Sequence, residues 1–309
     1  MNYNSGSAIT IKILILGAGG LGSEILKNLI PLNKIINEIH IIDFDTIELT
    51  NLNRQFLFNE NDIGKPKAIV AKSYFDNHFP DLDINIIAHN EDIFNLSMDF
   101  IQSFNFVISG LDSIEPRRFI NQKILQLTKD SNYNICIPFI DGGTEGFKGH
   151  VKTIIPGITS CWECSIDTLP SIQETVPMCT IANNPRSIEH IIQYVINVQF
   201  TNANLDDKSH LDKLLQLCIE RANQFNITID EKKFNVNYIL GVIKKIIPSV
   251  STTNAIIAGQ CCNMLIKIYY DLLNFDNLKN FSIYNGSDSV FNYVYVHQRN
   301  PNCTVCSSI

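Results

Sequence analysis

IKILILGAGGLG, residues 11–22, is the most informative segment of this 309-residue chain for its fold. Residues 11–16 form a continuous β-branched and leucine-rich run, which is typical of a strand buried on both faces of a parallel sheet. The glycine turn Gly17-x-Gly19-x-x-Gly22 follows, and a helical pattern continues to about residue 32. A second strand, IHII, covers residues 39–42. Strand, glycine turn, helix and strand make a βαβ unit, which predicts a parallel sheet.

The rest of the chain divides into a continuation of this pattern and an interruption of it. A helix at 65–78, strands at 84–88 and 106–109, and an apolar stretch at 135–141 extend the pattern, whereas residues from about 167 lack it and are mostly helical. We therefore predict a doubly wound, mostly parallel α/β fold with a helical insertion. Its parts are residues 1–166 (first part of the α/β domain), 167–245 (helical insertion) and 246–309 (second part).

Composition narrows the class of protein. With 45% hydrophobic and 18% charged residues the chain can bury a large core. Its net charge of -7 argues against general nucleic-acid binding. No apolar run reaches the ~18 residues of a membrane span, and the first ten residues show no secretory pattern. We expect a protein of the cytoplasm and nucleus that binds neither nucleic acid nor membrane and keeps its thiols reduced.

The glycine turn predicts a phosphate-binding site. Glycines let phosphates approach the backbone, and the helix that follows offers free N–H groups to an anion. Asp43 follows the second strand about twenty residues further on, where a carboxylate can accept hydrogen bonds from ribose hydroxyls. The motif alone is most typical of NAD or FAD binding, and glycines that serve only helix–strand packing are the structural alternative.

The residues after the second strand favour ATP over a nicotinamide cofactor. The loop from Asp43 to Phe56 carries Arg54 among several amides, and Lys67 and Asp112 follow. Arginine and lysine near a phosphate-binding turn can neutralise a triphosphate. An aspartate at the carboxyl end of a strand can hold Mg²⁺. Lys67 by itself is more typical of a solvated helix lysine, so the ATP prediction rests on these residues taken together.

Four of the nine cysteines form two C-x-x-C pairs, Cys161/Cys164 and Cys303/Cys306. Two such pairs can supply the four thiolates of a tetrahedral zinc site with no open position, which is a structural site. A redox-active pair is the alternative, but the chain has no thioredoxin-like context. We predict a structural Cys₄ zinc site that ties the end of the chain to its middle.

Cys179 has no neighbouring cysteine and lies in VPMCTIANNPR, residues 176–186, where the helical insertion begins. A thiol near a helix start has a lowered pKa and is a better nucleophile. By position alone, a lone cysteine is more often inert and buried. We give that inert interpretation to four others: Cys136, Cys218, Cys261 and Cys262.

These segments resemble the ubiquitin-activating superfamily. The matching stretches are GAGGLG (17–22), IIDFDTIELTNLNRQFLF (41–58), DIGKPKA (62–68) and GLDS (110–113). The Pro-x-Cys-Thr-Ile sequence around Cys179 resembles the catalytic-cysteine motif of that superfamily. Together with IDGGTEGFKG (140–149) and KKIIPSVSTTNAIIA (244–258), it is most similar to the catalytic subunits of the heterodimeric NEDD/Rub-type activating enzymes.

The resemblance implies a Rossmann-like adenylation domain, a catalytic-cysteine domain in the insertion, and a two-step reaction. The C-terminal glycine of a NEDD/Rub-type modifier is adenylated with ATP and Mg²⁺, and Cys179 then captures it as a thioester for a conjugating enzyme. Arg54 and Lys67 are implied to be catalytic, and Asp112 to hold Mg²⁺. The implied nucleotide-binding residues are Gly17, Ala18, Gly19, Gly20, Gly22, Asp43, Asp45, Asn51, Arg54, Gln55, Lys67, Leu111 and Asp112.

The resemblance also implies partners. Adenylation sites of this family receive an arginine from a partner segment of the form R-Y-x-R-Q, which this sequence lacks, so we expect a heterodimer with an inactive adenylation-like regulatory subunit. Larger relatives continue past the last zinc cysteine into a ubiquitin-fold domain that recruits the conjugating enzyme, whereas this sequence ends three residues after Cys306. The chain is either a naturally short form or a truncated one, and the adenylation and catalytic-cysteine domains are the candidate docking surfaces. Lys152 matches a basic position that disfavours ubiquitin through like-charge repulsion, with an ordinary exposed lysine as the alternative.

Four other functions remain possible interpretations. The chain could activate another modifier such as SUMO, or be a sulfur-carrier adenylyltransferase, which would lack the long helical insertion. A NAD-dependent oxidoreductase is disfavoured by Arg54 and Lys67. A pseudoenzyme scaffold is disfavoured because nucleotide-site residues and Cys179 occur together.

Overall fold

The structure is a computed structural model that describes residues 10–168, 182–205, 207–230, 234–243 and 249–307. The chain divides into two compact units, the first made of residues 1–168 and 249–309 and the second of residues 169–248. The limits predicted from the sequence, 167 and 245, lie close to these. They stay predictions, because stretches at both junctions lie outside the described residues. In the part of the chain that is described, no helix is long and apolar enough to span a membrane.

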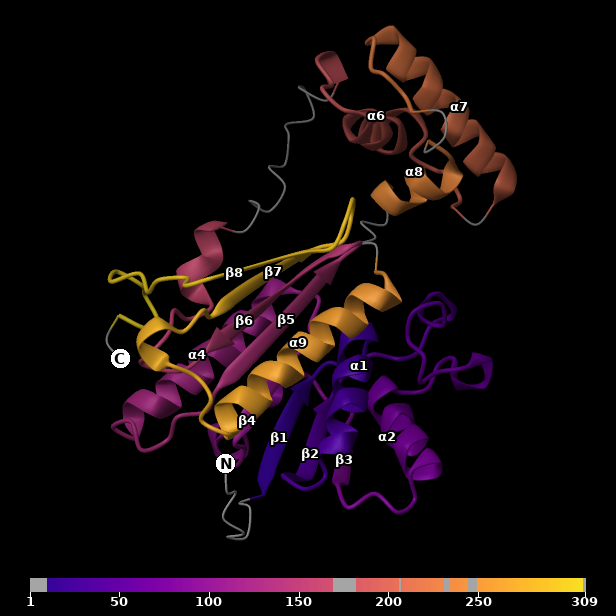
Figure 1. The fold of residues 1–309 in the computed structure, drawn as a ribbon. Coiled ribbons are helices and arrows are strands. Elements are labelled where there is room, and N and C mark those ends of the chain that lie inside the picture. The colour runs from indigo at the N-terminus through magenta and orange to yellow at the C-terminus, as the bar shows by residue number, and fades with distance from the viewer. Residues whose placement is uncertain (1–9, 169–181, 206, 231–233, 244–248, 308–309) are drawn as a thin grey trace. The chain divides into compact units, whose positions relative to one another are not determined.

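The first unit is built on one eight-stranded sheet with the strand order β3-β2-β1-β4-β5-β6-β7-β8 (Figure 1). The strands are β1 (Ile11–Leu16), β2 (Ile36–Ile42), β3 (Asn85–His89), β4 (Phe106–Ser109), β5 (Phe139–Glu145), β6 (Lys148–Ile154), β7 (Phe281–Asn285) and β8 (Phe291–Tyr295). Strands β1 to β5 pair in parallel, and β6, β7 and β8 extend the sheet in antiparallel fashion. The predicted mostly parallel α/β sheet is confirmed.

Strand register aligns the chain segments that matter for function. Leu16, the last residue of β1, pairs with Ile42 of β2 on one side and with Ser109 of β4 on the other. The loops that follow these three strands therefore begin at the same edge of the sheet. The chain moves from β1 to β2 in one direction and reaches β4 on the opposite side of β1, so β1 and β4 flank a topological switch point. Ligands bind α/β sheets at such a point, outside the carboxyl ends of the strands.

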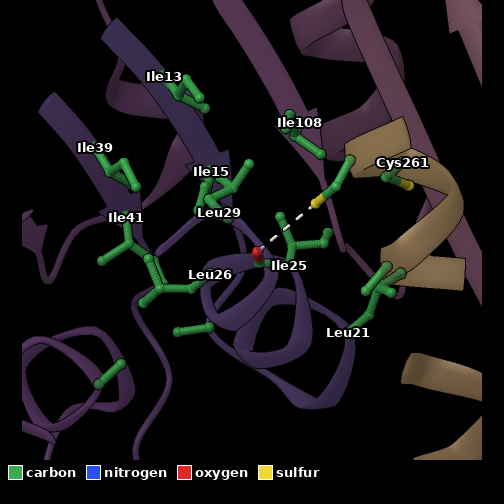
Figure 2. Packing of buried hydrophobic residues seen from close by; sticks show 14 of the residues in the cluster. Ile13, Ile15, Leu21, Ile25, Leu26, Leu29, Ile39, Ile41, Ile108 and Cys261 are labelled. Atoms are coloured by element: carbon green, nitrogen blue, oxygen red, sulfur yellow. Dashed lines mark hydrogen bonds between the residues drawn. The ribbon is translucent and has the colours of Figure 1, made fainter. Parts of the chain in front are cut away.

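Helices cover both faces of the sheet. Helices α1 (Gly20–Leu29), α2 (Lys67–His78) and α9 (Ser251–Tyr269) share one buried core with β1 and β2. In Figure 2, Ile25 and Leu26 of α1 point toward the isoleucines of β1 and β2, and Cys261 of α9 lies beside them. Helix α4 (Ile114–Asp130) contacts β5 and covers the face opposite α9 (Figure 1). A short helix, α3 (Met98–Gln102), precedes β4 and contacts α4.

Two elements differ from the sequence prediction. Helix α1 ends at Leu29, and a 3₁₀ turn with Pro31 in its first turn follows, because proline cannot continue the α-helical hydrogen bonds. The strand predicted at 135–141 is β5, shifted to Phe139–Glu145. It forms a hairpin with β6, which the sequence pattern did not predict, through Gly146 at φ +56°. This hairpin reverses the sheet from parallel to antiparallel.

The second unit has a small core of its own. Its described helices are α6 (Ile188–Tyr194), a π-helical turn (Val195–Gln199), α7 (Lys208–Gln224) and α8 (Val236–Ile243). Buried side chains from all four segments pack together, among them Ile191, Leu214 and Ile239. The regular structure described in this unit is helical, as predicted.

Candidate functional site

The glycine turn after β1 is packed too closely for side chains. Gly17 has a φ of +93°, and a Cβ built on it would lie 3.1 Å from the carbonyl oxygen of Gly110, which follows β4. A Cβ at Gly22 would overlap the carbonyl oxygen of Gly17. The start of α1, the β1 turn and the β4 turn therefore touch one another through their backbones. Glycines are required here for helix–strand packing, and they also leave the backbone open to a ligand.

The N-terminus of α1 is a potential anion site. No side chain caps the helix at Gly19, so N–H groups of its first turn are available to a phosphate. The loop after β2 folds back over this turn and brings the Gln55 amide and the Arg54 backbone close to Gly19 and Gly20. The Gln55 oxygen Oε1 is buried without a hydrogen-bond partner among the described residues. An unpaired polar atom beside a bare helix start fits a polar ligand.

Asp43, the residue after β2, is fixed against the glycine turn. Its Oδ2 accepts a hydrogen bond from the backbone N–H of Ala18 at 2.7 Å, and its Oδ1 accepts one from the N–H of Asp45 at 2.8 Å. Burial raises the pKa of Asp43 above its ordinary value and outweighs these hydrogen bonds and the nearby Lys67. The carboxylate is thus pre-positioned at the carboxyl edge of β2, where a ribose would lie in a doubly wound fold.

Lys67 is not a solvated helix lysine, so that alternative is wrong. The residue is only 8% exposed, and its Nζ forms an ion pair with Asp45 Oδ2 at 2.7 Å. Its backbone N–H also donates to the Asp45 carbonyl at 2.9 Å. The start of α2 is therefore joined to the loop after β2. A buried ammonium with one carboxylate partner still has two N–H donors for a phosphate.

Three further predicted nucleotide-binding residues differ in how far they are exposed to solvent. Arg54 is half-buried, and its Nη1 donates to the carbonyl of Thr50 at 2.5 Å. Asn51 is buried, and its Oδ1 accepts from the Glu48 N–H at 2.9 Å, so this amide shapes the loop. Asp112 is exposed in the loop after β4. Mg²⁺ is typically bound by one or two carboxylates together with substrate phosphates, which an exposed Asp112 at this edge would allow.

Asn254 is a residue of this site that sequence reasoning missed. It lies in the first turn of α9, and its side-chain nitrogen fills the space that a Cβ at Gly20 would occupy. Its Oδ1 accepts from the Thr144 hydroxyl at 2.7 Å, and its Nδ2 donates to Ser249 Oγ at 3.2 Å. Resemblance singled out the stretch that contains Asn254, but only the folded chain places it against the glycine turn.

The four predicted zinc ligands come together at a second site. Their sulfur atoms all lie within 4.8 Å of one another, with separations of 3.8 Å for Cys161–Cys164, 3.6 Å for Cys161–Cys303 and 3.4 Å for Cys164–Cys306. A tetrahedron with Zn–S bonds of about 2.3 Å has S–S edges of about 3.8 Å. The backbone N–H of Asn300 also donates to Cys164 Sγ at 3.4 Å. The donor set and its geometry fit a structural zinc ion.

The other cysteines divide into three cases. Cys218, Cys261 and Cys262 are buried, and burial raises the pKa of each thiol, as expected for inert core residues. Cys136 is exposed, so the prediction that it is buried is wrong. The apolar stretch predicted from residue 135 becomes a strand only at Phe139, so Cys136 lies before β5. Cys179 lies outside the described residues.

Lys152 is buried, so the interpretation of it as an ordinary exposed lysine is wrong. The residue, on β6, is 1% exposed, and its Nζ donates to Ser165 Oγ and lies 3.0 Å from His297 Nδ1. Loss of solvation lowers the pKa of Lys152 to about 8. Its role in disfavouring ubiquitin stays a prediction. Lys152 is enclosed by the pairing of β6 with β7 and by the segments that carry the four clustered cysteines. The local sequence around Lys152 predicts neither of these neighbours.

Comparison with known proteins places the chain in a family. The ThiF family model matches residues 8–305. The NEDD8-activating enzyme E1 catalytic subunit of Saccharomyces cerevisiae is 59% identical over 297 residues, which cover 96% of this chain and 98% of that protein. The protein of the same description from Schizosaccharomyces pombe is 40% identical over 326 residues, covering 97% of this chain and 70% of that protein.

Solved structures agree at the level of the fold. Escherichia coli MccB, in a crystal structure with ATP, aligns with a TM-score of 0.56 and 19% identity over 96% of this chain and 66% of that chain. At this identity the similarity concerns the fold alone. The family match and the two yeast relatives concern the sequence. They agree with the sheet and with the site formed by the glycine turn, Asp43 and the loop after β4, which we call the nucleotide crevice. The chain belongs to the ThiF family and, within it, to the family of NEDD8-activating enzyme E1 catalytic subunits.

Proposed function

We propose that this chain activates a NEDD/Rub-type ubiquitin-like modifier. In the first step the modifier's C-terminal glycine carboxylate attacks the α-phosphate of ATP, and pyrophosphate leaves. In the second, the Cys179 thiolate attacks the carbonyl carbon of the acyl-adenylate, AMP leaves, and the modifier is held as a thioester for transfer to a conjugating enzyme. The relatives described above are named as NEDD8-activating catalytic subunits, which supports this reaction.

One structural observation carries the adenylation step. Residues far apart in sequence, the Gly17–Gly22 turn, Asp43 and the Gly110–Asp112 loop, meet at the carboxyl edge around the switch point between β1 and β4. A bare helix N-terminus and a buried lysine border the same edge. Such an arrangement binds a nucleotide with its phosphates at the helix start.

The chain's own residues then have distinct tasks. Asp43 would bind the ribose, and Lys67 and Arg54 would neutralise charge on the phosphates as the pentacoordinate transition state forms. Mg²⁺ supplies further positive charge when bound, and Asp112 would hold it. Zinc at the four cysteines has no open position, so its role is structural.

Partner proteins are part of the proposal. The Saccharomyces cerevisiae relative is described as a catalytic subunit, which supports a heterodimer with an adenylation-like regulatory subunit. Strand β8 at the sheet edge carries exposed apolar and aromatic side chains, including Phe291, Tyr293 and Val294. Exposed apolar patches and unpaired strand edges are typical of protein-binding surfaces.

A thioester assay tests the proposed function. The chain is incubated with its candidate regulatory subunit, ATP–Mg²⁺ and, separately, NEDD/Rub, ubiquitin or SUMO, and adducts are resolved with and without reducing agent. We expect a reducible adduct with NEDD/Rub that Cys179→Ala abolishes. Cys136→Ser removes an exposed thiol elsewhere and serves as the matched control, which should leave the adduct unchanged. An adduct that survives Cys179→Ala, or one formed only with another modifier, would contradict the proposal.

A further inference from the structure

The first turns of α4 contact both the nucleotide crevice and the segment between Cys161 and Cys164. The cluster of four cysteines is called the cysteine site below. Helix α4 begins at Ile114, directly after the loop that contains Leu111 and Asp112. Its residues Arg117, Arg118 and Asn121 reach toward the segment between Cys161 and Cys164, either directly or through one intermediate side chain. One helix end is thus attached to both sites.

Arg117 holds the loop of the nucleotide crevice. Its Nη2 donates to the backbone carbonyl of Leu111 and, at 3.0 Å, to that of Gly142 on β5. The residue is only 8% exposed, so these hydrogen bonds are shielded from water. Asp112 is the next residue after Leu111. The position of the proposed Mg²⁺ ligand therefore depends on where the Arg117 guanidinium lies.

Asp141 in turn holds Arg117. The carboxylate is fully buried, and its Oδ1 lies 3.4 Å from Arg117 Nε. In the part of the chain that the structure describes, neither of these two atoms has a hydrogen-bond partner, so charge attraction is what joins them. Burial by itself raises the pKa of Asp141, but the Arg117 guanidinium and nearby hydrogen bonds bring it below its usual value, so the carboxylate stays charged. Removing one member of a buried ion pair leaves an uncompensated charge.

Trp162 connects this ion pair to the cysteine site. Its indole Nε1 donates to Asp141 Oδ2 at 3.1 Å, and its backbone N–H donates to Asn121 Oδ1 at 2.9 Å. Trp162 lies between Cys161 and Cys164, so its backbone path is constrained whenever these two thiolates bind one ion. An exposed link runs in parallel, because Arg118 pairs with Glu163 through two hydrogen bonds of 2.8 and 2.5 Å.

We propose that Asp141 and Arg117 are positioning residues that couple the cysteine site to the nucleotide crevice. A metal ion at the cysteines fixes Trp162, whose indole orients Asp141; Asp141 orients Arg117, and Arg117 holds the Leu111–Asp112 loop. Occupancy of the metal site therefore raises the affinity of the crevice for ATP–Mg²⁺. The inference rests on the proposed function, and it goes beyond it by giving the structural metal an effect on nucleotide binding.

Coupling between two sites is reciprocal, and this provides two readouts. The first is the Kd of the heterodimer for an ATP analogue with a non-cleavable α–β bridge, measured by calorimetry with zinc bound and after treatment with a zinc-selective chelator. We expect zinc removal to weaken binding about ten-fold. The second is the rate at which the chelator removes zinc, which a saturating concentration of the analogue should slow by a similar factor.

Trp162→Phe is the sharpest variant, because it removes the indole N–H and leaves a ring and all four cysteines. We expect it to retain its zinc, to bind the analogue as weakly as zinc-free wild type, and to lose the effect of the analogue on zinc release. Arg118→Gln removes the exposed link between the same two segments and is the matched control, expected to match wild type in both measurements. Arg117→Lys, which keeps the charge, should retain more affinity than Arg117→Met.

Two results would overturn the coupling. One is an analogue Kd that is the same with and without zinc in the wild-type heterodimer. The other is a Trp162→Phe variant that matches wild type in both Kd and zinc release. Neither readout requires a modifier or Cys179, so both are independent of the thioester assay. A wild-type heterodimer that binds the analogue but forms no adduct would contradict the proposed function and leave the coupling standing.

Discussion

Buried charges in the first unit are held by partners that lie far away in sequence. Lys67 pairs with Asp45, and Asp141 lies against Arg117 and the indole of Trp162. Each pairing joins two elements that no local pattern connects. Because charges are costly to bury alone, these partners decide which charged residues can serve the site and which only stabilise the sheet.

A single residue, His40 on β2, makes the free energy of unfolding depend on pH. Loss of solvation lowers the pKa of His40 below its ordinary value of 6.5, although Glu38 partly opposes this. The unfolded chain therefore binds more protons than the folded chain as the pH falls through 6.5. We expect the free energy of unfolding to decrease over that interval. His40→Gln should reduce the decrease, as measured by urea unfolding at about pH 7.5 and about pH 5.5.

The comparison is between the two pH values for each protein, so a general destabilisation by the substitution does not affect it. Glu38 also has a lowered pKa, chiefly because of its hydrogen bond with Lys12, but it titrates below 4.5, outside this interval. An equal loss of stability in wild type and His40→Gln would show that His40 is not the group responsible.

Among the helices and strands, α1 can pack closely against the turn after β1 because Gly17 and Gly22 have no side chains. A Cβ at Gly22 would overlap the Gly17 carbonyl oxygen, which is backbone and cannot move aside. We expect Gly22→Ala to reduce the free energy of unfolding of the first unit by about 3 kcal/mol or more, because α1 must separate from β1. Urea unfolding followed by circular dichroism measures this.

Gly259 in α9 provides the matched control. It is exposed, lies in the middle of a helix, and a Cβ built on it meets no atom within 4 Å. Gly259→Ala should raise stability by about 0.4–1 kcal/mol, because alanine has less conformational freedom to lose in a helix. If the two substitutions had similar effects, the proposed close packing at Gly22 would be wrong.

At the scale of the whole molecule, the two units have separate cores. The sheet core of the first unit gathers residues from both sides of the insertion, whereas the core of the second unit lies wholly between residues 188 and 243. We expect that replacing residues 169–248 with a flexible Gly/Ser linker leaves a folded first unit that retains zinc and binds the ATP analogue. The same protein should form no modifier adduct, because Cys179 is removed.

Zinc content by mass spectrometry and nucleotide affinity by calorimetry measure the outcome of this deletion. Replacing residues 208–224 alone, which removes α7 and keeps Cys179, is the control for loss of the second unit's fold. A shortened chain that aggregates or loses zinc would show that the first unit depends on the second for its stability.

Features that depend on local pattern and spacing could be predicted from the amino-acid sequence alone. Continuous apolar runs, a glycine turn and 3.6-residue periodicity predicted β1, α1 and the parallel half of the sheet, because these signals act within one element. Two C-x-x-C pairs predicted the cysteine cluster, because each pair already places two sulfurs on one ion. The glycine turn and the residues after the strands indicated an ATP site, and resemblance supplied its further residues and the role of Cys179.

The way in which distant segments meet could be learned only from the folded chain. The β5–β6 hairpin turns at Gly146, and β6, β7 and β8 then pair in antiparallel fashion, which periodicity within one segment does not predict. Burial of Lys152, the position of the Asn254 side chain beside Gly20, and the connection from Trp162 through Asp141 to Arg117 all depend on packing between elements. A side chain's environment is set by neighbours from the whole chain, and periodicity within one segment does not encode those neighbours.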